Sequence, residues 1–252
     1  MRFGIIGTGN AAHHFVWMLV GAGHQLCQVC GRADNGFASR FGAQYIPKVD
    51  QFDATLDLVI LAVNDDAIAS VSSDLSKSLF AIHLSGMTPL NVLSQKNHGV
   101  VWPIQSLSSS KELNYKSLPL LIEANNEKHQ TLLKSWFAPI SNTVVTGNFE
   151  QRVAAHVSAV FVNNFVNHLY DLTADYMKDY KLSFNLMMPI VREEMEKISV
   201  MTAEEAQTGP ARRGDIQTLK RQMDLLENRP HLAEIYQVLT NSILRKFHGK
   251  EL

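Results

Sequence analysis

The sequence has few cysteines, almost no net charge and no long hydrophobic run, and each lack excludes a class of protein. Its 252 residues include two cysteines, too few for the disulfide framework of a small secreted domain. A formal net charge of −1 excludes the broad basic surface of a protein that binds nucleic acid or anionic membranes. No stretch approaches the roughly 20 apolar residues that span a bilayer, and the first apolar run, Phe3–Ile6, is too short for a signal peptide. We therefore expect a cytoplasmic protein that binds neither nucleic acid nor membrane.

The two cysteines, Cys27 and Cys30, have the Cys-x-x-Cys spacing of redox and zinc motifs. They lie in the apolar run Gln25–Gly31, which predicts a β-strand, and residues three apart in a strand point to opposite faces. A single pair also lacks the partner ligands of a zinc site. We expect two buried strand residues and no metal site.

The first half of the chain alternates short apolar runs with segments of helical periodicity such as Ala11–Val20 and Asp65–Leu75. Nearly continuous apolar strands separated by helices are typical of a parallel sheet covered on both faces. This pattern predicts an α/β fold, a Rossmann-type doubly wound sheet over residues 1–148. The predicted strands are Arg2–Ile6, Gln25–Gly31, Leu56–Val63, Leu79–Leu84, Gly99–Ile104 and Leu118–Ile122.

From Phe149 the pattern becomes helical throughout. Residues 150–180 contain neither glycine nor proline and repeat apolar residues at helical spacing, which predicts one long helix as the spine of a second domain. Further helices are predicted at Ser183–Val200, Asp215–Leu226 and Leu232–Phe247, with Asp215 as an N-cap. The sequence therefore predicts a second, all-helical domain over residues 149–252.

The strongest local motif is Gly7-x-Gly9-x-x-Ala12, which follows the first predicted strand and opens a helix. In a dinucleotide-binding turn, the first glycine permits the tight turn and the second lets the backbone approach the pyrophosphate. The helix N-terminus then offers free N–H groups to the phosphates. An ordinary tight turn is the alternative. The expected cofactor-binding residues of this turn are Gly7, Thr8, Gly9, Asn10 and Ala11.

The residues after the second predicted strand indicate the cofactor. An NAD enzyme has a carboxylate there for the ribose hydroxyls, whereas this chain has Gly31-Arg32. A guanidinium suits the 2′-phosphate of NADP because it can bind bidentately and stack on adenine. Asp34 lies close by and keeps NAD as an alternative, and Arg32 could also be a surface arginine. We expect NADP(H).

The third predicted strand ends in a polar turn. Because the carboxyl ends of such strands line the ligand crevice, we expect Ala62, Val63 and Asn64 to border the ribose or the nicotinamide. The alternative is an ordinary helix N-cap at Asp65 or Asp66, which is compatible with that role.

The fourth predicted strand ends in His83-Leu84-Ser85-Gly86 at the same edge of the sheet. His83 or Ser85 could contact nicotinamide or substrate, or could be satisfied within the loop.

The long predicted helix carries unusual polar residues. At α-helical spacing His156, Asn163 and Asn167 share a narrow sector, and Asn164 and His168 form an adjacent pair. Such groups either bond to neighbouring helices and a dimer mate, or face a substrate cleft. Of the first three, His156 alone can exchange a proton near neutral pH.

The segment Thr208–Asp215 predicts a compact loop between helices. Gly209 and Pro210 would end one helix. Alternatively, Arg212 or Arg213 binds an anionic substrate group or a partner subunit.

These motifs together resemble a family of Rossmann-like proteins with a C-terminal domain called DUF2520. The wider set includes pyrroline-5-carboxylate reductase, enzymes similar to 6-phosphogluconate dehydrogenase, and the coenzyme F420-dependent NADP oxidoreductase. The resemblance implies an NADP-binding domain followed by a helical domain that commonly mediates dimerisation, and thus a homodimer. It rests on GTGNAA (7–12), AVNDDAI (62–68), HLSG (83–86), AHVSAVFVNNF (155–165) and TGPARRGD (208–215).

The chain departs from its relatives at two places. Trp102 stands before Pro103-Ile104-Gln105, where the family often has a histidine, and residues 150–177 lack the lysine that hydroxyacid dehydrogenases use. These departures argue against a lysine-dependent oxidation of hydroxyacids and favour a non-catalytic alternative. The leading expectation is hydride transfer between NADP(H) and a small carbonyl or imine in a cleft between the domains. His156 would donate the proton, Asn163 orient the substrate and Arg213 bind an anionic group. The alternatives are a non-catalytic NADP-binding sensor or assembly protein, and a coenzyme F420-dependent NADP oxidoreductase.

Overall fold

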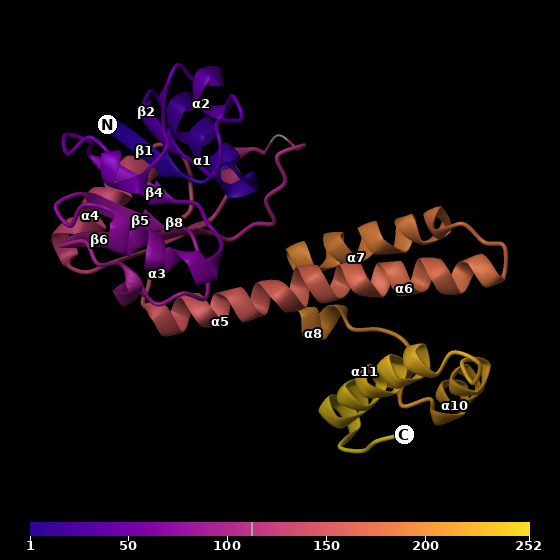
Figure 1. Cartoon of the computed structure of the whole chain (residues 1–252). Helices are drawn as coiled ribbons and strands as arrows, with labels where there is room; N and C mark the ends of the chain where they lie inside the picture. Colours follow the sequence, from indigo (N-terminus) through magenta and orange to yellow (C-terminus); the bar gives the residue numbers. More distant parts are fainter. Residues whose placement is uncertain (112) are drawn as a thin grey trace. The chain divides into compact units, whose positions relative to one another are not determined.

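The computed structural model describes residues 1–111 and 113–252, which form two compact units, residues 1–164 and 165–252. The first unit is built on a β-sheet and the second is helical (Figure 1). Asn148, where the sequence places a domain boundary, is the N-cap of a helix, and the boundary itself stays a prediction. Across both described ranges, no helix combines the length and the apolar character needed to span a membrane.

Eight strands of the described residues form one sheet in the order β3-β2-β1-β4-β5-β6-β7-β8. All neighbouring strands are parallel except β6 and β7. The order reverses between β1 and β4, and this is the switch point outside which such sheets bind ligands. The strands are β1 Arg2–Ile6, β2 Gln25–Cys30, β3 Gln44–Ile46, β4 Leu58–Leu61, β5 Phe80–His83, β6 Asn97–Pro103, β7 Leu120–Ala124 and β8 Val144–Thr146.

Helices cover both faces of this sheet, as the sequence predicts. Leu58 and Ile60 of β4 pack in one core cluster with Phe15 of α1 and Phe137 of α4. The alternate residues of β4 pack in a second cluster with Ile68 of α3. The helices of this unit are α1 Asn10–Gly21, α2 Phe37–Arg40, α3 Asp65–Asp74, α4 Glu127–Phe137 and α5 Phe149–Ala159.

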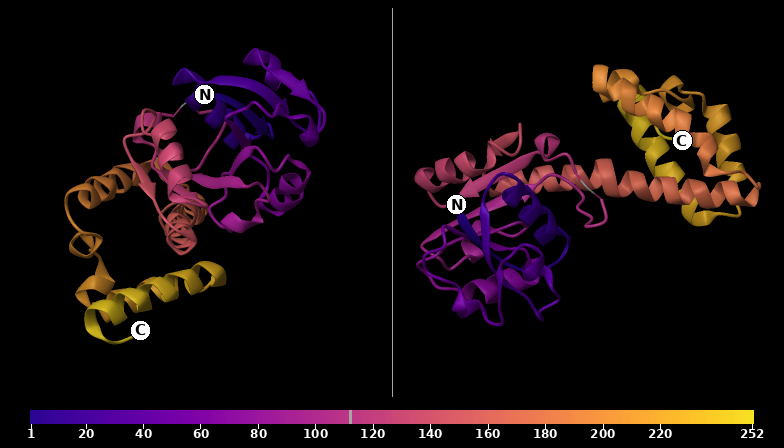
Figure 2. Two further views of the ribbon diagram at one scale, coloured as in Figure 1. Left: turned by 90° about the vertical axis from the view of Figure 1, so that its left-hand side faces the viewer. Right: turned by 90° about the horizontal axis from the view of Figure 1, so that it is seen from above.

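The long predicted helix begins at Phe149 but is not α-helical throughout. A capping box of Asn148 and Gln151 starts α5, and a π-helical segment, Val160–Phe165, follows α5 directly and precedes α6 (Val166–Asp179) along the chain (Figure 2). A π-turn holds more residues than an α-turn, so the regular α-helical spacing is interrupted between His156 and Asn167. His156 and Asn163 nevertheless line one pocket, and the sector that they share with Asn167 stays a prediction.

The remaining helices belong to residues 165–252 and confirm the predicted helical pattern. Pro189 lies in the first turn of α7 and Pro230 begins α11, where a missing N–H costs no hydrogen bond. The helices are α6 Val166–Asp179, α7 Met188–Val200, α8 Ala203–Ala206, α9 Pro210–Arg213, α10 Ile216–Leu225 and α11 Pro230–His248.

Two local expectations have clear outcomes. Cys27 and Cys30 both lie on β2 and are free thiols, Cys30 buried and Cys27 half-buried. The alternative N-cap at Asp65 or Asp66 is wrong, because Asn64 is the N-cap of α3. The Asp65 carboxylate instead accepts a hydrogen bond from the Ser85 hydroxyl at 2.6 Å.

Candidate active site

The glycine turn after β1 packs against the ends of two neighbouring strands. The Gly7 N–H donates to the Cys30 carbonyl of β2 at 2.8 Å. Gly7 has φ +106°, and a Cβ there would lie 2.2 Å from the Ala62 carbonyl oxygen. Both the backbone conformation and the close approach therefore require glycine.

Gly9 is different, because a Cβ there would meet nothing within 4 Å. Gly9 is the N-cap of α1 with ordinary backbone angles, and no side chain caps this helix N-terminus. Packing does not demand glycine here, yet the residue leaves open space in front of uncapped N–H groups. Nearby, the Thr8 hydroxyl accepts from the Asn35 amide at 3.1 Å and the Asn10 side chain accepts from the Ser109 N–H at 3.2 Å.

The loop after β2 carries the two residues that bear on cofactor choice. Asp34 uses one carboxylate oxygen to accept the Gly36 N–H at 3.0 Å, which closes a local turn. Arg32 is exposed, and its side chain has no hydrogen bond or ion pair to another described residue. The loop thus engages the carboxylate and leaves the guanidinium available.

The turn after β4 lies beside the glycine turn. The Ala62 N–H donates to the Ile6 carbonyl at 2.8 Å, so Ala62 follows the sheet edge directly. Val63 is half-buried and Asn64 is exposed. These three residues stand at the switch point between β1 and β4.

His83 at the end of β5 is fully buried. Its Nδ1 accepts the Ser85 N–H at 3.2 Å, which puts the ring proton on Nε2. Desolvation by burial, followed by the Arg152 charge, lowers the pKa of His83 to about 4, against an opposing contribution from the Pro89 carbonyl. His83 is therefore a neutral ring held within the loop after β5, and its expected contact with a cofactor stays a prediction.

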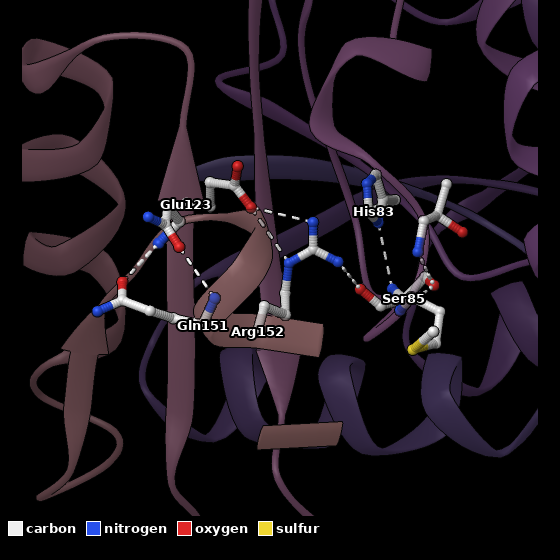
Figure 3. Close-up of polar contacts among 8 residues, drawn as sticks. His83, Ser85, Glu123, Gln151 and Arg152 are labelled. Carbon is white, nitrogen blue, oxygen red and sulfur yellow. Dashed lines mark hydrogen bonds and ion pairs between the residues drawn. The ribbon is translucent and has the colours of Figure 1, made fainter. Parts of the chain in front are cut away.

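Ser85 joins three parts of the α/β unit through both of its oxygens. Its hydroxyl donates to Asp65 and accepts the Met87 and Thr88 N–H groups. Its carbonyl accepts from Arg152 Nη1 at 2.8 Å (Figure 3). The other side of the Arg152 guanidinium donates to Glu123 on β7.

A pocket of about 690 Å³ lies where the end of β6 meets α5 and the π-helical segment. The His156 and Trp102 rings are 5.6 Å apart between centroids, and a Cβ on Gly86 would touch both side chains. His156, half-buried, thus stands beside the loop after β5. The lining residues are Trp102, Ile104, Gln105, Ser106, Ala155, His156, Ser158, Ala159, Val160, Val162, Asn163 and Asn164.

The predicted residue Arg213 belongs to residues 165–252. Gly209 and Gly214, both with positive φ, bracket α9, and Asp215 caps α10 as expected. The Arg212 guanidinium lies 4.1 Å from the Phe247 ring centroid. Arg213 is exposed and has no hydrogen bond or ion pair among the residues that the structure describes. Of the two arginines, Arg213 is the one available to an anion.

Sequence reasoning missed the buried pair of Arg152 and Glu123. The Arg152 side chain has no exposed surface and that of Glu123 is 12% exposed. One signal was available: Arg152 precedes His156 by four residues, so in a helix the two share a face. Glu123 gave no comparable signal, because it stands at the end of an otherwise apolar strand.

Two family models match the chain. Residues 118–243, which are 126 of the 252 residues, match a domain of unknown function, DUF2520. Residues 2–84 match the NADP oxidoreductases described as coenzyme F420-dependent. No curated protein sequence matches the chain.

Solved structures match over nearly the whole length. A protein from Bacteroides fragilis described as an NADP oxidoreductase is 29% identical, with a TM-score of 0.85 over 97% of this chain and 98% of that chain. A 1-pyrroline-5-carboxylate reductase from Streptococcus pyogenes is 14% identical, with a TM-score of 0.66 over 99% of both chains. An imine reductase from Myxococcus stipitatus, in complex with NADP+, is 13% identical, with a TM-score of 0.66 over 100% and 96%. The fold is therefore that of NADP oxidoreductases.

Proposed function

This chain belongs to the DUF2520 family, and we propose that it transfers a hydride between NADP(H) and a small imine or carbonyl compound. The observation that carries the proposal is the pocket that holds His156 and Asn163 beside the loop after β5. That loop lies at the carboxyl edge of the parallel strands, where Rossmann-type sheets bind their ligands.

The residues of the glycine turn fit a dinucleotide. Gly7 is fixed by its contact with Ala62, whereas Gly9 leaves space before the uncapped N-terminus of α1. A pyrophosphate in that space would accept from the free N–H groups and interact favourably with the helix dipole. We propose Gly7, Thr8, Gly9, Asn10 and Ala11 as its binding turn, with Ala62, Val63 and Asn64 beside the ribose or nicotinamide.

We propose NADP(H) over NAD(H) because of the loop after β2. The unpaired Arg32 offers a planar fork to a 2′-phosphate, whereas Asp34 already accepts the Gly36 N–H. One Asp34 oxygen is engaged in its own turn, so fewer of its acceptor sites remain for a ribose hydroxyl.

The chemistry divides between the cofactor and the pocket. NADPH, when bound, supplies the hydride that reduces the acceptor carbon. His156 is proposed to donate the proton that the imine nitrogen or carbonyl oxygen gains, which yields the amine or alcohol and NADP+. Asn163 would orient the substrate, and Arg213 stays the proposed group for an anionic substituent. Ser85 would border the nicotinamide, with buried His83 fixing its backbone.

The first experiment is calorimetric titration of the protein with NADPH and NADH, repeated on Arg32→Ala. Loss of one charge-assisted phosphate contact, worth roughly 1.5–3 kcal/mol, predicts NADPH binding weaker by about 10- to 100-fold and NADH binding unchanged. Arg221→Ala, which removes an exposed arginine of α10, is the matched control. Equal affinities for both nucleotides in the wild type would refute the NADP preference.

The second experiment follows NADPH absorbance with a panel of cyclic imines and small carbonyl compounds. Turnover that is lost in His156→Ala, with NADPH affinity retained, supports the proton-donor role. Tight NADPH binding without any turnover would favour the non-catalytic sensor. Oxidation of NADPH by a deazaflavin alone would favour the F420-dependent alternative.

We also propose a homodimer formed through the helical residues 165–252. Several large apolar side chains stand exposed on residues 165–252, and exposed apolar surface of this kind commonly marks an interaction site. On α7 they include Ile190 at 67% and Val200 at 80% exposure. Burying these side chains against a second copy would remove them from water.

A further inference from the structure

A fully buried arginine stands one helical turn before the proposed proton donor. Arg152 lies in the first turn of α5 with no exposed side-chain surface, and His156 follows four residues later on the same face. Burying a guanidinium is unfavourable, and an apolar side chain of similar volume often packs as well or better. A buried charge at this position therefore needs a reason other than stability.

The three hydrogen bonds of Arg152 indicate that reason. Nε and Nη2 donate to the same Glu123 oxygen at 3.2 and 3.0 Å, and Nη1 donates to the Ser85 carbonyl at 2.8 Å. A planar fork donates in fixed directions, which neither lysine nor an apolar residue can reproduce. Glu123 on β7 thus orients the guanidinium, and the guanidinium holds the loop after β5 (Figure 3).

The held loop contacts the proton donor directly. Gly86 follows Ser85, and a Cβ on Gly86 would lie 2.4 Å from His156 Cδ2. Arg152 and His156, on one face of α5, therefore contact the consecutive loop residues Ser85 and Gly86. The Ser85 hydroxyl carries the connection on to Asp65, at the first residue of α3.

We propose that Arg152 is a positioning residue which, oriented by Glu123, fixes the distance between His156 and the loop at residues 83–86. The proposal rests on the proposed function for its catalytic meaning, but the geometry it asserts can be measured without substrate.

The geometric test uses Trp102 as a reporter of His156. The His156 ring lies 5.6 Å from the Trp102 ring between centroids and is expected to quench its fluorescence, so the gain in Trp102 fluorescence on His156→Gln at one fixed pH measures the quenching amplitude. The background is Trp17→Phe with Trp136→Phe, which leaves Trp102 as the one tryptophan of the three. In this background Arg152→Lys and Arg152→Met are expected to lose at least half of the quenching amplitude. His156→Gln shows how much of the signal comes from His156.

The kinetic test separates positioning from folding. Displacement of a reacting group by about 1 Å costs on the order of 100-fold in rate, so kcat of Arg152→Lys is expected to fall by about that factor. KM for NADPH should change less than about twofold, since the glycine turn is untouched. The kcat of Glu123→Gln should lie between those of the wild type and Arg152→Lys. Glu150→Gln, an exposed charge change on the same helix, is the matched control.

The outcomes decide the proposal in every case. Arg152→Lys with wild-type quenching amplitude, or with kcat within threefold of the wild type, overturns it. If Arg152→Met does not fold, Arg152→Lys and Glu123→Gln decide alone. If the wild type binds NADPH but reduces no substrate, the proposed function fails while the fluorescence experiment still decides the role of Arg152.

Discussion

The substitution Gly86→Ala probes the point where the loop after β5 packs against His156 and Trp102. The added Cβ would lie 2.4 Å from His156 Cδ2 and 3.0 Å from Trp102 Cε2. Carbon atoms normally approach to about 3.5 Å, so the imidazole must retreat by about 1 Å. Gly86 does not have a positive φ, which leaves the steric contact as the cause of any effect.

Two magnitudes follow from that displacement. Misplacing the proton donor by about 1 Å predicts a loss of kcat on the order of 100-fold. Overpacking of this kind costs about 1–3 kcal/mol of unfolding free energy, and the lower end applies because half-buried His156 can move outward. NADPH affinity should stay within about twofold, since the phosphate-binding turn lies elsewhere.

Steady-state kinetics, nucleotide titration and urea unfolding measure these three quantities on one preparation. Gly21→Ala is the matched control, because a Cβ at Gly21 meets nothing within 4 Å and Gly21 has no positive φ. A folded Gly86→Ala protein with kcat within threefold of the wild type would refute the placement of His156 in the reaction. An equal loss in the Gly21→Ala control would refute the steric argument.

Two further predictions concern pH and assembly. The pKa of His83 is about 4 in the fold against 6.5 in the unfolded chain, so the unfolded chain binds the proton more tightly. The stability from neutral His83 is complete above about pH 6.5, and about 3 kcal/mol of it is lost as pH falls towards 4. Urea unfolding at several pH values should therefore show a smaller loss of unfolding free energy over this range in His83→Gln than in the wild type. An equal loss in both proteins would contradict the prediction. For assembly, Ile190→Glu should weaken the proposed dimer at least about tenfold in sedimentation experiments while Glu194→Gln does not, and a wild-type monomer at high concentration would exclude the dimer.

Much of the fold was predictable because its signals are local. The strand predicted at Arg2–Ile6 has the observed bounds, and the predicted core strands appear because continuous apolar runs leave few alternatives. The three-residue strands β3 and β8 were not predicted, since three residues do not establish a period. Helix α4 was missed because its fully buried residues, Leu133 and Phe137, are too few for a clear apolar stripe.

The same distinction between local and long-range signals applies to the residues of the site. Gly7 could be recognised because its conformation and its contact with Ala62 demand glycine. The pair of Arg152 and Glu123 could not, because the partners are 29 residues apart and belong to different elements. The π-helical segment is also invisible to a pattern search, since apolar residues continue through it at nearly helical spacing.

The antiparallel strand β7 determines the heading of α5. Because Pro103 pairs with Leu120 and Gly99 with Ala124, the chain turns back along the sheet, and β8 follows β7 in parallel. The next segment, α5, therefore travels toward the end of β6 and reaches Trp102 with His156. Anyone who grafts the helical half onto another dinucleotide domain should carry β7 and β8 with it. A junction at residue 148 would keep helices α5 to α11 but would discard β7 and β8, the two strands that set the direction of α5.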